Sequence, residues 1–269
     1  MIGLILQVVL LEILAETVGL GQAGWVTGVA FGVMTCAALT WGLHRAAVGS
    51  FAKLASETGG TFAKLASETG GTFATLASET GGTFAKLPSE TVGTFGPADW
   101  VTLTRATLVG CVAALTADSW QRRAPVKVLV AIAIVALVLD ALDGQVARRT
   151  GTVSGLGARF DMEVDAILIL VLSVYVARSM GAWVLAIGVM RYAFVVMGWA
   201  LRWLRGPVPP RFWRKVVAAT QAVVLVFAAS DILPSPLIVA ALAAALALLA
   251  ESFGRDIVWL WRHSVVEAH

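Results

Sequence analysis

The sequence predicts an all-α polytopic membrane protein, and three observations support that prediction. Hydrophobic residues make up 58% of the 269 residues and charged residues only 14%, against about 45–50% and 25% in soluble domains. Mean hydropathy is +0.84. The apolar residues form eight stretches that approach the roughly 20 residues a helix needs to cross a bilayer. These features exclude a disordered chain and an ordinary soluble enzyme, and a net charge of +3 is too small to indicate nucleic acid as a partner.

The first two stretches predict a pair of transmembrane helices in residues 1–46. They cover about residues 2–20 and 24–43, and the first lacks the basic segment with which a cleaved signal peptide begins. Glu12 and Glu16 lie four residues apart on one face of the first helix. We expect this face to contact other helices or the lipid headgroups, although acidic residues inside a membrane can also be functional.

Residues 47–96 are predicted to be a cytoplasmic linker. They contain four copies of an 11-residue unit over residues 51–94, which begins as FAKLASETGGT. The Gly-Gly pair in three copies disfavours a continuous helix, at roughly 1 kcal/mol per glycine, and units this short fall below the usual repeat folds. The alternative is a docking strip for a partner or a membrane surface, because Phe and Leu recur three residues apart in each unit.

Six further stretches follow in residues 97–269, which we assign to one domain with a short cytoplasmic tail. They cover about residues 100–117, 126–142, 158–177, 181–201, 216–233 and 236–253. With the N-terminus in the cytoplasm, fourteen of the 20 Lys and Arg residues fall on the cytoplasmic side and four on the other. Because positive charge is enriched in cytoplasmic loops, we expect a multi-pass protein of the cell membrane with both termini inside.

Four aspartates at the inner ends of two neighbouring stretches indicate the chemistry. Asp140 and Asp143 end one stretch, and Asp161 and Asp165 begin the next. At about 100° per residue, each pair falls on one face of its helix. A short connection between antiparallel helices can point all four carboxylates to one spot. Such carboxylates repel one another and are costly in a membrane, which favours one or two hard cations such as Mg²⁺ or Mn²⁺. A pair of metal ions in turn suits a diphosphate substrate.

Small residues lie on the same helix faces as the aspartates. Gly144, Ala147 and Gly157 leave room for a ligand to approach the backbone, although small residues at such spacing also serve helix packing. With Arg148, they complete the pattern D-x2-D-G-x2-A-R-x8-G-x3-D-x3-D over residues 140–165.

This pattern resembles the signature of the CDP-alcohol phosphotransferase (CDP-alcohol phosphatidyltransferase) family, and every fixed position is present. The resemblance covers about residues 97–255 and implies a six-helix core, here preceded by two extra transmembrane helices. It implies a phospholipid-synthesis enzyme in which an acceptor hydroxyl attacks the diphosphate of a CDP-alcohol, with CDP-diacylglycerol as the leading donor, and CMP is released. It also implies a homodimer and a two-metal site of Asp140, Asp143, Asp161 and Asp165, with Asp165 as the general base.

The resemblance implies a nucleotide site as well. Family members often open the first core helix with Pro and then N-x2-T-x2-R, and here Asp99 stands at the Asn position. The residues implied in binding the cytidine nucleotide are Thr102, Arg105, Asp143, Gly144, Ala147, Arg148 and Gly157.

The acceptor alcohol stays open. Bacterial phosphatidylglycerophosphate synthases carry R-E in the fourth core helix and G-K-x-K-T-x2-Q before the fifth. Here Tyr192 follows the arginine of that pair, and Val217 and Ala218 replace the second Lys and the Thr. Basic residues at cytoplasmic helix ends could bind an acidic acceptor group, and the candidates are Arg191, Arg211, Arg214 and Lys215.

Two other function classes fit parts of the pattern. An aspartate-rich membrane prenyltransferase also binds diphosphate through metals, but the spacing from Gly144 to Arg148 follows the nucleotide-binding signature. The third class is a non-catalytic membrane protein, such as a transporter with an ion site or a degenerate scaffold, and the presence of all four aspartates argues against degeneracy. Arg159 and Glu163 lie four residues apart on the predicted helix that carries Asp161 and Asp165, on the face opposite these aspartates. Their spacing predicts a local ion pair, and the alternative is a contact with the acceptor or with a second copy in a dimer.

Overall fold

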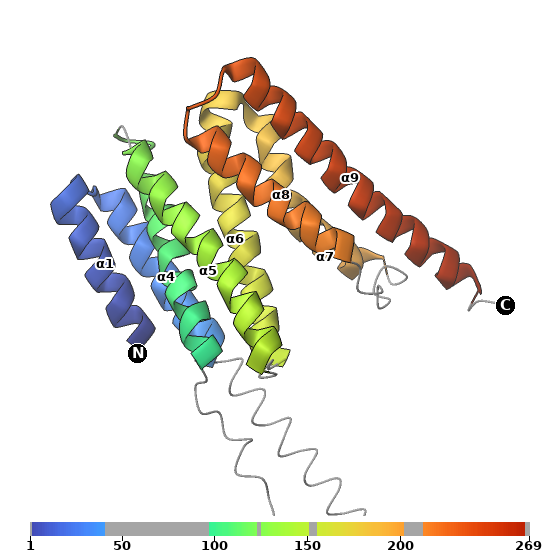
Figure 1. Ribbon diagram of the computed structural model, residues 1–269, viewed down its shortest axis with the longest axis horizontal. Helices are drawn as coiled ribbons and strands as arrows, with labels where there is room; N and C mark the ends of the chain where they lie inside the picture. The colour runs from blue at the N-terminus through green and yellow to red at the C-terminus, as the bar shows by residue number, and fades with distance from the viewer. Residues whose placement is uncertain (1, 41–96, 123–124, 151–154, 202–211, 267–269) are drawn as a thin grey trace, which may run out of the picture.

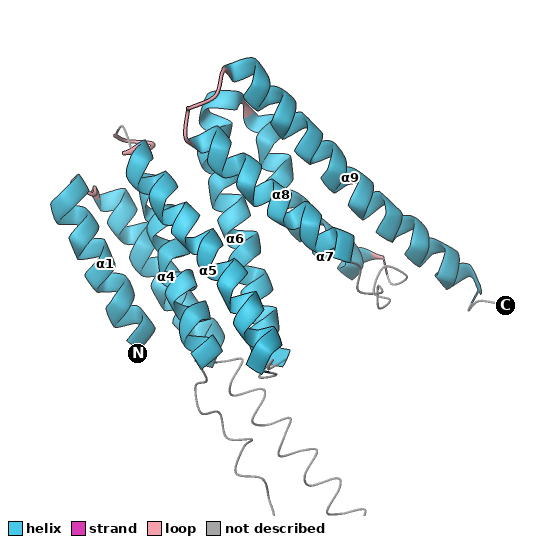
Figure 2. Ribbon diagram, in the orientation of Figure 1, coloured by secondary structure: helices cyan, strands magenta, loops and turns pink. Residues whose placement is uncertain are grey.

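The structure is a computed structural model that describes residues 2–40, 97–122, 125–150, 155–201 and 212–266. Within these ranges the regular secondary structure is helical throughout, without a strand (Figure 2). The predicted all-α class is therefore confirmed for the described part of the chain. The repeats of the predicted linker lie outside it.

Successive helices run up and down the bundle, so that their ends alternate between its two sides (Figure 1). Helix α1 spans Ile2–Val18 and is followed by a helix over Gln22–Thr40. The later helices are α4 (Pro97–Asp118), α5 (Val126–Thr150), α6 (Gly155–Met180), α7 (Leu185–Ala200), α8 (Phe212–Ala229) and α9 (Ser235–Val266), with the 3-10 turn η2 (Ala182–Val184) before α7.

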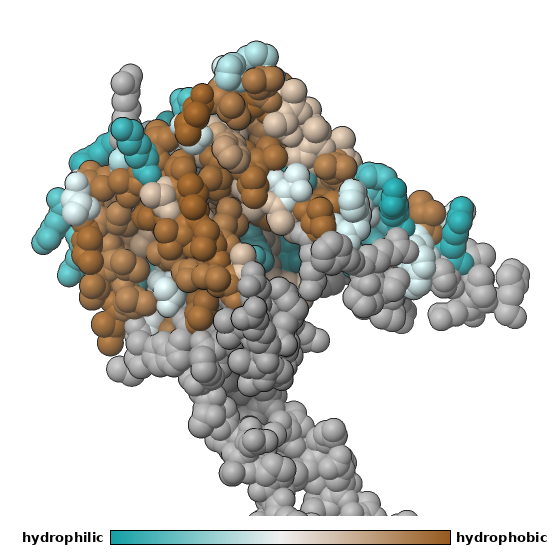
Figure 3. Space-filling view, in the orientation of Figure 1, coloured by the Kyte–Doolittle hydropathy of each residue, from teal (hydrophilic) through white to brown (hydrophobic). Residues whose placement is uncertain are grey.

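Several helices are those of a helical membrane protein. By length and composition, the segments Gln22–Thr40, Val101–Asp118 and Ser235–Arg262 can each cross a membrane, whereas Ala182–Met197 and Val216–Ala229 are shorter apolar helices. Helices α5 and α6 have 25 and 26 residues, about 38 Å at 1.5 Å per residue. Hydrophobic residues cover most of the described face in Figure 3, and hydrophilic residues gather towards its ends.

Helix α6 packs against α4, α7 and α8. Its buried stripe is formed by Val164, Leu168, Leu172 and Val176, which recur every four residues and so share one face of the helix. Burial of this stripe stabilises one rotation of α6 about its axis. That rotation decides which way the polar residues of its first turns point.

The N-terminal helices pack directly on α4. Helix α1 contacts α4, and a Cβ on Gly24 would lie 2.9 Å from the backbone oxygen of Ala114. At the end of α4, the carboxylate of Asp118 accepts a hydrogen bond from the backbone N–H of Gly21 at 2.9 Å. The close approach of the helices at Gly24 is typical of small residues between membrane helices. The division into residues 1–46, 47–96 and 97–269 remains a prediction.

Candidate metal and nucleotide site

Three helices bring predicted site residues together at one end of the bundle. Arg105 lies in the first half of α4, Asp140 lies in the second half of α5, and Asp161 and Asp165 lie in the first half of α6. Because these neighbours run antiparallel, the segments meet at the same end. One carboxylate oxygen from each of the three aspartates lies within 4.8 Å of the others.

Arg105 lies between the three carboxylates. Its Nη1 is 3.1 Å from Oδ1 of Asp140 and also donates to Asp161, while Nη2 donates to Asp165. The arginine side chain is 1% exposed, whereas the aspartates are 34–37% exposed. The guanidinium is therefore shielded from solvent, whereas the carboxylates of the cluster are partly exposed.

The donor set fits a hard divalent cation. Carboxylate oxygens are the ligands that Mg²⁺ and Mn²⁺ prefer. Opposite ligands on Mg²⁺ lie about 4.2 Å apart, at 2.0–2.1 Å from the ion, and the described oxygens are within 4.8 Å of one another. Small side-chain rotations would close that difference. Asp140, Asp161 and Asp165 also carry more negative charge than one guanidinium offsets.

Other predicted site residues have side chains outside the described part of the chain. Helix α5 contains Asp143, Gly144, Ala147 and Arg148, and helix α6 contains Gly157, but only the helical backbone is described at these positions. The same holds for the side chain of Lys215, and Arg211 lies outside the described residues altogether.

Thr102 is described, and it is buried on α4 with 7% exposed. It lies three residues before Arg105, so the two residues share one face of the helix. The pair predicted to contact the nucleotide is therefore directed into the bundle at the level of the aspartates.

Two of the predicted acceptor-binding cations are held by carboxylates on other helices. Nη2 of Arg191 on α7 lies 2.6 Å from Oε1 of Glu163 on α6. Glu163 is two residues from both aspartates of α6, about 200° around the helix, so this ion pair lies on the other face. On α8, Nε of Arg214 donates to Oδ2 of Asp256 on α9 at 2.8 Å, and Asp256 is buried.

The sequence alone does not connect these partners. The family resemblance assigns Arg105 to the nucleotide, whereas an arginine within an apolar stretch also needs a partner inside the membrane. The i,i+4 rule predicts Arg159 as a partner of Glu163, and this pair stays a prediction because the side chain of Arg159 lies outside the described part of the chain. The structure shows Arg191 on α7 as a partner of Glu163. A spacing rule within one helix does not detect a cation on another helix.

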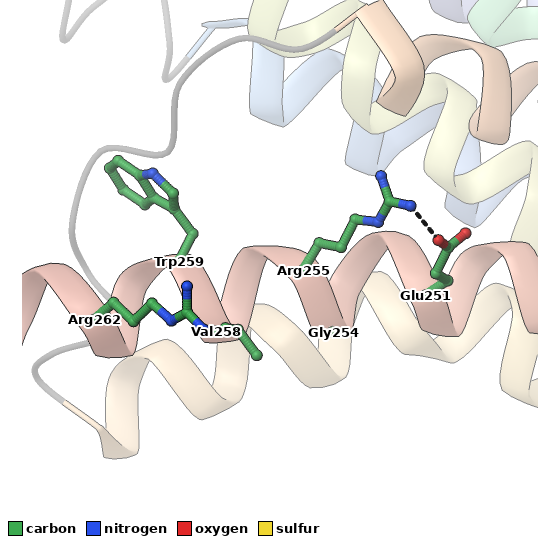
Figure 4. Close-up of a pocket in the computed structure, with 6 residues that line it drawn as sticks. All are labelled: Glu251, Gly254, Arg255, Val258, Trp259 and Arg262. Atoms are coloured by element: carbon green, nitrogen blue, oxygen red, sulfur yellow. Dashed lines mark hydrogen bonds and ion pairs between the residues drawn. The ribbon is translucent and has the colours of Figure 1, made fainter.

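A groove of about 520 Å³ lies along the second half of α9, away from the aspartates (Figure 4). It is lined by Glu251, Gly254, Arg255, Val258, Trp259 and Arg262. Glu251 and Arg255 form an ion pair between successive turns, which accounts for two of its three charges. A second hollow of about 600 Å³ includes Arg178 and Asp231, at the end of the bundle opposite to the aspartate cluster. Among the described residues, neither hollow is lined by a predicted metal ligand.

Comparison with protein families gives one match. The family model described as CDP-alcohol phosphatidyltransferase matches residues 96–250, which is more than half of the chain and includes Arg105 and the clustered aspartates. Neither curated proteins nor solved structures gave a match. The resemblance predicted from the aspartate pattern is thereby confirmed.

Proposed function

The chain belongs to the CDP-alcohol phosphatidyltransferase family, and from that premise we propose that it transfers a phosphatidyl group from CDP-diacylglycerol to an alcohol and releases CMP. The family supports a transferase of phospholipid biosynthesis that acts on a CDP-alcohol. The observation that carries the proposal is the convergence of Asp140, Asp161 and Asp165 within the matched region. Clustered carboxylates can hold divalent cations, and such cations bind a diphosphate.

We assign catalysis to residues 97–269 as a six-helix core with a short tail, and residues 1–46 to two additional transmembrane helices joined to it by residues 47–96. The distribution of positive charge favours a cytoplasmic location for both termini and for the aspartate end of the bundle. In the cell membrane, this orientation places the donor lipid in the inner leaflet with its nucleotide in the cytoplasm. The proposed unit is a homodimer.

The proposed metal ligands are Asp140, Asp143, Asp161 and Asp165. Two bound Mg²⁺ or Mn²⁺ ions would neutralise charge on the diphosphate and on the departing CMP. Asp143, Gly144, Ala147, Arg148 and Gly157 would contact the nucleotide together with Thr102 and Arg105. The candidates for the acceptor remain Arg191, Arg211, Arg214 and Lys215.

Asp165 is the proposed general base. The acceptor hydroxyl attacks the phosphorus that carries the diacylglycerol, and a new P–O bond forms as the bond to the bridging oxygen breaks. CMP leaves with that oxygen, and Asp165 takes the hydroxyl proton. Asp165 lies one turn beyond Asp161 on α6, further from the start of the helix, and its side chain is 37% exposed. A hydroxyl arriving from the lipid side can therefore reach it.

Purified protein in lipid nanodiscs tests the proposal. With labelled CDP-diacylglycerol, Mg²⁺ and a panel of alcohols, we expect CMP release that stops when EDTA removes the cation. Release of pyrophosphate from a prenyl diphosphate, without CMP from the CDP-lipid, would instead identify a prenyltransferase. No turnover of either substrate would favour a non-catalytic membrane protein. Lipid analysis of cells with and without the protein identifies the acceptor.

A further inference from the structure

We propose that Arg105 is the counter-ion of the aspartate cluster when no metal is bound, and that divalent cations displace its guanidinium, which then binds the diphosphate of the substrate. The first half of this inference concerns the cluster alone. The second half rests on the proposed function, since it needs a diphosphate ligand.

The contacts of Arg105 explain how the cluster stays assembled without metal. Its two terminal nitrogens reach Asp140 on α5 and both Asp161 and Asp165 on α6, so one guanidinium joins three helices. Its side chain is almost completely buried. A buried arginine and clustered carboxylates would each be costly alone, and each here satisfies the other.

The guanidinium and a metal ion compete for the same three carboxylates. The three carboxylates that could hold a cation are those that Arg105 binds, through Oδ1 in each case. A divalent ion approaches such oxygens to about 2.0–2.1 Å and repels a guanidinium held beside it. Binding of the metal and contact of Arg105 with all three aspartates therefore exclude each other.

The balance of charge in the cluster favours movement of the Arg105 guanidinium from the aspartates to the diphosphate of the substrate. Three carboxylates and one guanidinium leave a net negative charge, which attracts a divalent cation. With Asp143 as the fourth acid, two divalent ions balance the carboxylates and leave Arg105 without a counter-ion. Nε of Arg105 is buried and has no hydrogen-bond partner among the described residues. A displaced guanidinium thus offers a fork of donors that matches a phosphate.

Metal affinity without nucleotide tests the competition. We expect Arg105→Gln to bind Mn²⁺ at least tenfold more tightly than the wild type, measured by calorimetry or electron paramagnetic resonance. Arg255→Gln is the matched control, because it removes the same charge from an ion pair with Glu251 on α9, outside the proposed site. We expect it to change Mn²⁺ affinity less than threefold. Unchanged or weaker binding of Mn²⁺ by the Arg105 variant would overturn the proposal, and so would an equal gain in both variants.

Thermal unfolding gives an independent readout. Without metal, Arg105→Gln should unfold at a lower temperature than the wild type, and Mn²⁺ should raise its Tm more than it raises that of the wild type. If this variant does not fold, Arg105→Lys retains the charge but not the fork that bridges three carboxylates, and it should still bind Mn²⁺ more tightly. Wild-type affinity in the lysine variant would contradict the competition.

CDP is the probe for the second half. At saturating Mn²⁺, Arg105→Gln should bind CDP at least tenfold more weakly, whereas Arg255→Gln should not. Equal CDP affinity in both variants would overturn the transfer to diphosphate. Because none of these measurements uses turnover, a protein that shows the Mn²⁺ effect but releases no CMP from CDP-diacylglycerol would retain the counter-ion role of Arg105 and lose the proposed function.

Discussion

Asp161 and Asp165 lie one turn apart on α6 and both bind Arg105, while Glu163 between them binds Arg191 on another helix. At the scale of single residues, α6 therefore offers acids of similar size on opposite faces, only two positions apart. Substitutions at these positions separate the chemistry of the cluster from a general loss of charge or of helix stability.

Asp161→Asn removes one carboxylate from the cluster and retains its size. We expect CMP release to fall below about a tenth of wild type, equivalent to roughly 1.4 kcal/mol or more, while the protein stays folded in the membrane. Asp143→Asn should behave in the same way. Glu163→Gln is the control, because it removes a carboxylate from the other face of α6. We expect Mg²⁺ to raise the Tm of this variant as much as it raises the Tm of the wild type. An Asp161→Asn protein with more than a tenth of the activity would contradict the two-metal site.

Asp165→Asn separates a base from a ligand, because the amide oxygen can still bind metal whereas the amide cannot accept the proton. We expect CDP to bind in the presence of Mg²⁺ while the rate falls at least about 100-fold, the low end for general-base catalysis. Nucleotide affinity and turnover are measured on one preparation. If affinity is lost together with the rate, Asp165 is chiefly a metal ligand and the base lies elsewhere.

At the scale of helices, α4 connects the N-terminal pair to the site. It contacts α1 on one side and α5 and α6 on the other, and it carries Arg105. Gly110 in the middle of α4 allows a close approach, since a Cβ there would lie 2.6 Å from Nε2 of Gln7 and 2.8 Å from Cδ1 of Phe31. Gln7 and Phe31 are both buried, so neither can move aside freely.

Gly110→Leu should therefore separate the N-terminal helices from α4. We expect a loss of about 1–3 kcal/mol from overpacking, seen as a lower Tm, despite the roughly 1 kcal/mol that helix propensity gains when glycine is replaced. Gly254→Leu on α9 is the matched control, because an added Cβ would meet no atom within 4 Å among the described residues beyond its own stretch of helix. That variant should unfold at the wild-type temperature or above it. Equal Tm values for the two variants would argue against tight packing at Gly110.

At the scale of the whole molecule, the long segment between the N-terminal pair and α4 carries the four repeats. Deletion of residues 51–83 removes three 11-residue units and retains the last. Because the free energy of closing a loop changes by only about 0.6 kcal/mol per doubling of length, we expect CMP release per folded molecule to stay within about twofold of wild type. Loss of turnover in a protein that still inserts and folds would instead favour the docking strip.

The amino-acid sequence by itself determined the class of the protein and its chemical family. Apolar length predicts membrane helices, and the spacing of aspartates within α5 and α6 predicts one acidic face on each. Both are properties of a single helix, set by 3.6 residues per turn, so they can be derived without knowing which helices are neighbours. The family resemblance follows from the same local spacing, and the match over residues 96–250 confirms it.

Only the tertiary structure decided how these faces are used. It places Arg105 among aspartates that lie 56 and 60 residues further along the chain, and it pairs Glu163 with a cation of α7. It also packs the N-terminal helices on the helix that carries Arg105. These contacts depend on the rotation of each helix about its axis, which is set by burial of stripes such as Val164 and Leu168 against other helices. No spacing within one helix contains that information, because the partner of a charge is chosen by which faces meet.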